Sequence, residues 1–380
     1  MAKRISKNEL QKILGDQKLR KWLAHEDPLW FALIYLRHYF SFQFAPFHIE
    51  MFNILRDEKY KMITIMAFRG SGKSTILNTV NVLWSILGKP QNKFAVIVSQ
   101  SQDQAKNHFN NIKEELLNNE LLREDFGPFS DDEKEWRKMS LELTYREAKI
   151  LSISKEQSIR GIKHKSARPD LVIGDDLEDD SMKLDDSERN KLYARFMSEI
   201  MPLGDENTRI VVLGNLICED SLLMKLKDIK RDDGIFRVYP IIDNNRKLLW
   251  KEKFNTIEEI NKLQKKFPID VWVKEFLLKN ISFNDDGEMP HPIYSKRESR
   301  KGGRIWSMNL LAQKPLIPPM EEFNIFQPSK YYTIPIFPTM DESKEYLRFI
   351  GNLDLSEPMI SPEEKLLEII EKTDIRRKNS

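Results

Sequence analysis

The chain has 380 residues, 40% of them hydrophobic and 10% aromatic, which is enough for a substantial buried core and for two domains. Its 61 Lys and Arg nearly balance 59 Asp and Glu, and this net charge of +2 excludes a protein that coats nucleic acid through one-sided charge, so any DNA contact must be local. The single cysteine, Cys218, excludes an intramolecular disulfide, and the absence of a signal peptide and of a long apolar stretch predicts a cytosolic protein without a membrane span.

Residues 1–45 are predicted to form a helical N-terminal segment. Leucines and aromatic residues recur there at helical spacing, from Leu10 to Leu23 and again from Leu29 to Phe40. We interpret this aromatic stripe as part of the core rather than as a binding face.

An apolar strand over residues 63–68 then enters a loop of small residues, and a helix is predicted to start near Ser74. This is the layout of a phosphate-binding P-loop, because Gly70 and Gly72 let backbone N–H groups turn inward around an anion at the positive end of a helix. Ala67 stands where the usual motif has its first glycine. The flanking strand and the amphipathic helix over residues 76–87 nevertheless argue against a chance match.

The P-loop predicts a nucleotide site that includes Mg²⁺. Lys73 is expected to reach the β- and γ-phosphates, and the Ser74 hydroxyl is expected to ligate Mg²⁺. Arg69 could reach the γ-phosphate and stabilise transition-state charge, or it could be an ordinary surface arginine. The residues predicted to bind the nucleotide are Arg69, Gly70, Ser71, Gly72, Lys73, Ser74 and Thr75.

Beyond the loop, short apolar runs alternate with helical segments. Four further strands are predicted at residues 94–98, 148–153, 171–174 and 209–213. Strands that are separated by helices predict an α/β fold with a mostly parallel sheet covered on both faces. We assign this P-loop domain to residues 46–240.

A run of acids follows the predicted strand at residues 171–174, at the end of the strand where open α/β sheets hold their ligands. Asp175 is predicted to hold Mg²⁺, directly or through water, with a helix-capping acid as the alternative. Asp176 is the first candidate for activating the attacking water. Glu178 is its rival, because its longer side chain could reach back from the turn. Asp179 and Asp180 are interpreted as helix N-caps.

Two shorter features fit the same site. Gly214 and Asn215 follow the strand at residues 209–213, and the Asn215 amide could sense the γ-phosphate, although Gly-Asn is equally an ordinary turn. The segment Ile159-Arg160-Gly161 follows the strand at residues 148–153, and it could equally belong to the site or be an ordinary turn.

Taken in order, these residues resemble the ATPase portion of the large terminase subunit of tailed bacteriophages, the motor that packages DNA into proheads. The resemblance spans roughly residues 42–280, and the arginine-bearing P-loop and the Asp-Asp-x-Glu run are its more specific pieces. It rests on Phe47-His48, the loop from Arg69 to Thr75, Ile159-Arg160-Gly161, the acid strand from Arg168 to Asp179, Leu213-Gly214-Asn215, the run from Asp220 to Leu223, and the segment from Trp272 to Leu277.

The resemblance implies an ATP-driven translocase of double-stranded DNA with the fold of an additional-strand P-loop ATPase. Lys73 and Ser74 would bind ATP and Mg²⁺, and Asp175 would be the metal carboxylate. Arg69 would be the cis-acting arginine, and Asn215 would couple hydrolysis to movement. The resemblance also implies a homo-oligomeric ring on a portal, a small terminase subunit as partner, and the bacterial host cytoplasm as location.

The chain departs from the family pattern in three places. His48 stands where a glutamine often reads adenine, which leaves base specificity open, and Asn215 replaces the more usual hydroxyl residue. Residues 346–354 look like the first strand of an RNase-H-like nuclease with Asp354 as its first acid, but only 26 of the 380 residues follow. We therefore assign residues 241–340 to a helical or irregular linker region and residues 341–380 to a truncated nuclease start, and we expect no independent endonuclease activity.

Two other functions are compatible with a P-loop. A helicase-like or DNA-repair motor of the same ATPase class would share the phosphate site, but no second set of helicase motifs follows Leu223. A regulatory or scaffold protein would bind nucleotide without turnover.

Overall fold

The computed structural model describes residues 12–130, 136, 139–159, 161–179, 182, 185–229, 231–243 and 247–279. In these residues a seven-stranded sheet has the order β3-β4-β2-β5-β6-β1-β7. The strands are β1 (Met62–Ala67), β2 (Phe94–Ser99), β3 (Ser140–Leu143), β4 (Ala148–Ser154), β5 (Leu171–Asp175), β6 (Arg209–Gly214) and β7 (Gly234–Tyr239). Neighbouring strands are parallel except β3 and β4, which are antiparallel, so the predicted mostly parallel sheet is confirmed.

Strand β6 lies between the P-loop strand β1 and the acid strand β5. In the parallel register, Asp175 of β5 is opposite Leu213, and Met66 of β1 is opposite Gly214. The carboxyl ends of all three strands therefore meet at one edge of the sheet, where α/β proteins place their ligands. This is the additional-strand arrangement that was predicted.

The sequence pattern does not predict β3 and β7, which form the two edges of the sheet. Strand β3 has only four residues and exposes Glu142. Strand β7 carries Arg237, whose Nε donates to Glu50 Oε1 at 2.7 Å. Short strands and charged side chains are usual at sheet edges, and they interrupt the apolar run by which a buried strand is recognised.

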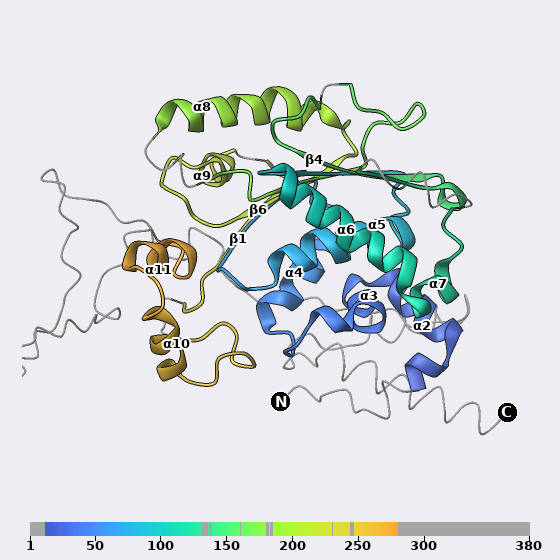
Figure 1. Cartoon of the computed structure of the whole chain (residues 1–380), viewed down its shortest axis with the longest axis horizontal. Helices are drawn as coiled ribbons and strands as arrows, with labels where there is room; N and C mark the ends of the chain where they lie inside the picture. The colour runs from blue at the N-terminus through green and yellow to red at the C-terminus, as the bar shows by residue number, and fades with distance from the viewer. Residues whose placement is uncertain are drawn as a thin grey trace, which may run out of the picture.

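Helices cover both faces of the sheet (Figure 1). One face carries α2 (Gln17–Glu26), α3 (Pro28–Tyr35), α4 (Pro46–Arg56), the π-helical stretch η2 (Thr75–Val80) with its continuation α5 (Asn81–Leu87), α6 (Gln102–Asn118) and α7 (Glu120–Phe126). The other face carries α8 (Asp186–Arg195), η6 (Phe196–Ile200) and α9 (Leu222–Lys227). Helices α10 (Ile257–Gln264) and α11 (Ile269–Glu275) follow β7, and the short 3₁₀ turns are η1 (Arg37–Tyr39), η4 (Thr144–Arg146) and η7 (Met201–Leu203).

Two apolar cores lie on the two faces of the sheet. Side chains alternate along a strand, so Ile63 and Ile65 of β1 belong to the core under the N-terminal helices. Met62 and Met66 of the same strand belong to the core under α8 and α9. The sheet is therefore buried on both faces, as parallel sheets require.

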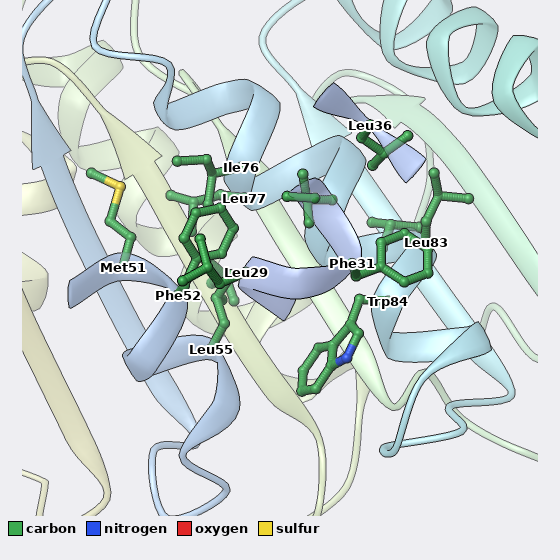
Figure 2. Close-up of a cluster of buried hydrophobic side chains, with 14 of the residues drawn as sticks. Leu29, Phe31, Leu36, Met51, Phe52, Leu55, Ile76, Leu77, Leu83 and Trp84 are labelled. Atoms are coloured by element: carbon green, nitrogen blue, oxygen red, sulfur yellow. The ribbon is translucent and has the colours of Figure 1, made fainter. Parts of the chain in front are cut away.

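The N-terminal helices pack directly on the helix that follows the P-loop. Figure 2 shows side chains from α3 and α4 facing those of η2 and α5, and the residues labelled there are Leu29, Phe31, Leu36, Met51, Phe52, Leu55, Ile76, Leu77, Leu83 and Trp84. Full burial of each such side chain contributes about 1.5–3 kcal/mol. Because Trp30 and Phe31 are also buried, the prediction that the N-terminal aromatic residues belong to the core is confirmed for them.

A buried ionic cluster ties α2 to α7. Arg20 makes two parallel bonds to Asp125, from Nε to Oδ2 at 2.7 Å and from Nη2 to Oδ1 at 2.8 Å. Tyr35 Oη also donates to Asp125 Oδ2 at 2.7 Å. Arg20 and Asp125 are 5% and 4% exposed, so each is the main counter-charge of the other in place of water, and Arg20 Nη2 also lies 3.0 Å from Glu124 Oε1.

The domain boundaries after residues 45, 240 and 340 stay predictions. The expected nuclease start at residues 341–380 lies outside the described residues. In the part of the chain that the structure describes, no helix combines the length and apolar character needed to span a membrane.

Candidate nucleotide-binding site

The loop between β1 and η2 passes through two backbone conformations that favour glycine. Gly70 and Gly72 have φ angles of +76° and +85°, a region that costs other residues about 1–2 kcal/mol. A helix begins at Lys73, so the N–H groups of its first turn lie next to the loop. Lys73 N donates to Ser71 Oγ at 3.4 Å and Ile76 N to Gly72 O at 3.1 Å. The loop thus has the turn expected of an anion-binding P-loop.

A pocket of about 470 Å³ opens beside this loop, and small-ligand sites are typically about 300–1,000 Å³. Its walls come from the P-loop, the start of α6, the turn after β5, the end of β6 and the end of α11. The predicted site residues that line it are Arg69, Gly70, Lys73, Ser74, Asp176, Glu178 and Asn215. Ser71, Gly72, Thr75 and Asp175 are not among the lining residues.

Lys73 connects the P-loop to the end of β6. Its Nζ donates to Asn215 Oδ1 at 2.5 Å and lies 4.0 Å from Asp176 Oδ1. This contact is possible because β6 is the neighbour of β1 in the sheet. Asn215 therefore bonds directly to the ammonium group that is predicted to hold the phosphates.

Asp175 is the last residue of β5 and is buried. Its Oδ1 faces Ser74 Oγ at 3.4 Å, whereas a strong O–H···O bond is about 2.5–3.0 Å. A hydroxyl and a carboxylate oxygen are the pair that P-loop proteins use for Mg²⁺. The described residues contain no group of three or more His, Cys, Asp or Glu that could hold a metal ion. Mg²⁺ sites in nucleotide-binding proteins usually take one or two protein ligands and complete their coordination with phosphate and water oxygens.

The other oxygen of Asp175 has two protein partners. Asn78 Nδ2 donates to Asp175 Oδ2 at 2.7 Å, and His108 Nε2 lies 2.6 Å from the same oxygen. Asn78 belongs to η2 and His108 to α6. The carboxylate is thus held between two helices.

Asp176 lines the pocket immediately after the strand. Its φ angle is +44°, a left-handed conformation that Asp and Asn adopt more readily than most residues. Its backbone N–H donates to Leu213 O at 2.9 Å, which continues the pairing of β5 with β6. Burial raises the pKa of the Asp176 carboxyl, and the Lys73 ammonium partly offsets this effect.

Glu178 has a different set of partners from Asp176. Its Oε1 accepts from Leu222 N at 2.7 Å, so the carboxylate sits at the free N–H groups that begin α9. Burial raises the pKa of Glu178, and the bonds from the α9 backbone oppose that shift. Both acids that were predicted to compete for the water-activating role line the pocket, but Glu178 is already bonded to a helix end.

The connection from β6 to α9 is anchored to the pocket at both ends. At its start Asn215 accepts from Lys73, and at its end Leu222 donates to Glu178. Cys218, the single cysteine of the chain, lies between these anchors and is partly buried.

Arg69 lies at the rim of the pocket and is paired with α11. Its Nη1 donates to Glu275 Oε2 at 3.0 Å, and its backbone N–H donates to Glu275 O at 2.8 Å. The Arg69 side chain is 59% exposed. The contact of Arg69 with the γ-phosphate stays a prediction. To make this contact, the Arg69 side chain would have to leave the Glu275 carboxylate.

His48 lies under the P-loop and is 1% exposed. Its Nδ1 accepts from Ala45 N at 2.9 Å, so the proton is on Nε2, which donates to Ser71 O at 2.6 Å. Lys253 Nζ donates to the adjacent carbonyl, Gly70 O, at 2.7 Å. These two side chains brace the backbone of the loop, and His48 is not among the residues that line the pocket.

The free energy of unfolding is expected to fall at acidic pH because of His48. Burial lowers the pKa of His48 from 6.5 to about 4, so between these values the unfolded chain binds a proton that the folded chain does not. The contribution of neutral His48 to the free energy of unfolding is therefore fully present above about pH 6.5 and is lost as the pH falls toward 4. The loss is about 1.4 kcal/mol per pH unit, or about 3 kcal/mol in all. Urea unfolding at several pH values measures this slope.

His48→Gln is the matched control, because an amide keeps one donor and one acceptor at similar reach but does not titrate. The free energy of unfolding of wild type should fall more steeply than that of the variant between about pH 6.5 and pH 4.5. Parallel curves for the two proteins would show that His48 does not control this dependence.

Five further residues contact or line the site and have no role in the sequence-based prediction: Asn78, Gln100, Gln104, His108 and Glu275. Asn78 follows Ser74 by one helical turn, so its spacing could have placed it on the face of the helix that meets the acid strand. Gln100 and Gln104 follow β2, whose carboxyl end lies beside that of β5. His108 has no local signal, because its partner is distant in the sequence. Glu275 lies in the segment from Trp272 to Leu277 on which the resemblance rests, but its pairing with Arg69 has no local signal either.

No family model and no curated protein matches the chain. Among solved structures, the HK97 bacteriophage large terminase is 18% identical over 49% of this chain and 36% of that protein, with a TM-score of 0.34. A mutant ATPase domain of the large terminase of Thermus phage P74-26 is 14% identical over 63% of this chain and 94% of that domain, with a TM-score of 0.40. The chain thus spans about a third of the length of the HK97 protein.

Proposed function

We propose that this chain is an ATP-hydrolysing motor subunit that drives the packaging of double-stranded phage DNA into proheads. One observation supports ATP hydrolysis. Lys73, Asp176 and Asn215 meet at one pocket, and they follow three neighbouring parallel strands. The side-chain oxygens of Ser74 and Asp175 lie beside them. The packaging role is supported by the order of the motifs, which resembles that of large terminases.

In this proposal the loop backbone and Lys73 bind the β- and γ-phosphates of ATP. Ser74 Oγ and Asp175 Oδ1 would hold Mg²⁺, which would supply positive charge to the phosphate oxygens. The carboxylate of Asp176 orients the attacking water and accepts its proton, because Glu178 is bonded to the start of α9.

The connection between β6 and α9 offers a route from chemistry to movement. Asn215 bonds to Lys73, so a change in the position of the Lys73 ammonium after hydrolysis would alter the start of this connection. Arg69, released from Glu275, would stabilise charge at the γ-phosphate as the cis-acting arginine.

The wider assembly also belongs to the proposal. The motor would act as a homo-oligomeric ring on a portal, with a small terminase subunit as partner, in the cytoplasm of the bacterial host. We propose that this chain has no endonuclease activity of its own, and cutting of plasmid DNA by the purified protein with Mg²⁺ or Mn²⁺ would contradict this.

Steady-state ATP hydrolysis with and without linear double-stranded DNA tests the proposal, with Lys73→Ala as the blank. We expect Mg²⁺-dependent turnover that rises with DNA and disappears in the variant, because an alanine removes the ammonium that contacts the phosphates. ATP binding without turnover would favour the scaffold function. Turnover that is indifferent to DNA would argue against a DNA motor.

A further inference from the structure

We propose that His108, together with Asn78, positions the Asp175 carboxylate so that Oδ1 alone is presented to Mg²⁺. This inference rests on the proposed nucleotide function of the site and deepens it. The sequence patterns attach no role to either residue, and the two come from different helices that meet at the end of β5.

The two contacts fall on one oxygen of the carboxylate. Asn78 Nδ2 is 2.7 Å and His108 Nε2 is 2.6 Å from Asp175 Oδ2, whereas among the described residues Oδ1 has only the long 3.4 Å contact with Ser74 Oγ. Two donors use both lone pairs of Oδ2. Oδ1 is therefore the oxygen left for a metal, and it is already on the side of Ser74.

The Asp175 carboxylate decides which atom of each partner faces it, because its oxygens can only accept. Asn78 is 0% exposed, and its amide must turn Nδ2 rather than Oδ1 toward Asp175, since two oxygens would repel each other. His108 donates to Oδ2 through Nε2, because a carboxylate oxygen can only accept, and both ring nitrogens of His108 lie 3.4 Å from Asn78 Nδ2. Asn78 lies in the π-helical stretch η2, and such irregular turns are frequent at functional sites.

The consequence is a preorganised metal carboxylate. A free carboxylate rotates and can turn either oxygen, or both, to a cation, and part of the binding free energy is lost in stopping that rotation. When a residue that hydrogen-bonds to a metal ligand and fixes its orientation is removed, metal affinity or activity typically falls about 10- to 100-fold. His108 and Asn78 are positioning residues in this sense, since they act through Asp175.

The test measures Mn²⁺ binding in the presence of ADP by electron paramagnetic resonance, a readout that does not require turnover. We expect His108→Ala to weaken Mn²⁺ binding about 10- to 100-fold, and His108→Gln to stay within about threefold of wild type because its amide still donates to the carboxylate. His38→Ala is the matched control, since His38 Nε2 also contacts a carboxylate, Glu115 Oε1 at 2.8 Å, on a residue that does not line the pocket.

If His108→Ala only lowers the stability of the protein, the folded variant will bind Mn²⁺ about as tightly as wild type. This result would overturn the proposal. If the alanine variant does not fold, His108→Leu replaces it, because leucine fills the space but donates nothing. Wild type that binds Mn²⁺ with ADP but does not hydrolyse ATP would contradict only the proposed function, and the comparison of variants would still decide the role of His108. Wild type that binds no Mn²⁺ with ADP would overturn both.

Discussion

Replacing Asp176 with asparagine is expected to lower ATP turnover by about 10²- to 10⁴-fold, the range typical of a lost general base. Asp176 lines the pocket 4.0 Å from Lys73 Nζ. Asparagine has nearly the same size and also tolerates the left-handed conformation at φ +44°. The variant should therefore keep the fold and bind nucleotide within about threefold of wild type, which is the signature of a group needed only in the transition state.

Steady-state kinetics and the fluorescence of a labelled nucleotide measure turnover and binding separately. Glu178→Gln is the matched control, because glutamine keeps an oxygen for Leu222 N but loses the negative charge at the start of α9. We expect this variant to have a slightly lower melting temperature and to retain much more turnover than Asp176→Asn. If Glu178→Gln is the more damaged of the two, the assignment of the water-activating acid is reversed.

Replacing Arg20 with alanine is expected to lower the free energy of unfolding by about 3–5 kcal/mol, because it leaves a buried carboxylate without its counter-charge. Asp125 would keep two neutral partners, the Tyr35 hydroxyl at 2.7 Å and the Gln17 side chain, in a position that is 4% exposed. Urea unfolding followed by circular dichroism measures the change. The loss should be far larger than one ion pair at the surface contributes, because most of it is the desolvation of Asp125.

Two controls separate desolvation from the simple loss of a bond. Arg231 makes a similar double contact with Asp233 at 2.7 Å, but both side chains are about a third exposed, so Arg231→Ala should cost no more than about 1 kcal/mol. The double variant Arg20→Met/Asp125→Leu should be more stable than Arg20→Ala, because it removes both charges and keeps apolar volume. A double variant that is no better than the single one would contradict this explanation.

The parts of the site that could be predicted are those that are continuous in the sequence. The P-loop and the acid run after β5 each lie within one short segment, and the order of the strands follows from the alternation of apolar runs and helices. The position of Asp175 at the end of β5 could be predicted in the same way, because a strand of small and apolar residues stops where the acids begin.

The parts that could not be predicted depend on contacts between distant residues. Arg69 and Glu275 are 206 positions apart, and Glu178 and Leu222 are 44 positions apart. Their meeting is decided by the order of strands in the sheet and by the return of the chain after β7. The orientation of His48 could not be predicted either. Its position in the sequence places it near the nucleotide, whereas in the structure its ring lies under the loop and donates to Ser71 O.

The connection between β6 and α9 also makes the protein suited to observation at a single position. Because the chain has only one cysteine, a thiol-reactive fluorophore would attach at Cys218 alone, without any prior substitution. Burial raises the pKa of the Cys218 thiol, so its alkylation at neutral pH should be slow and should respond to how far this segment opens. With Asn215 bonded to Lys73 at one end and Leu222 to Glu178 at the other, a dye there would report in real time whether an occupied phosphate site shifts the segment next to it.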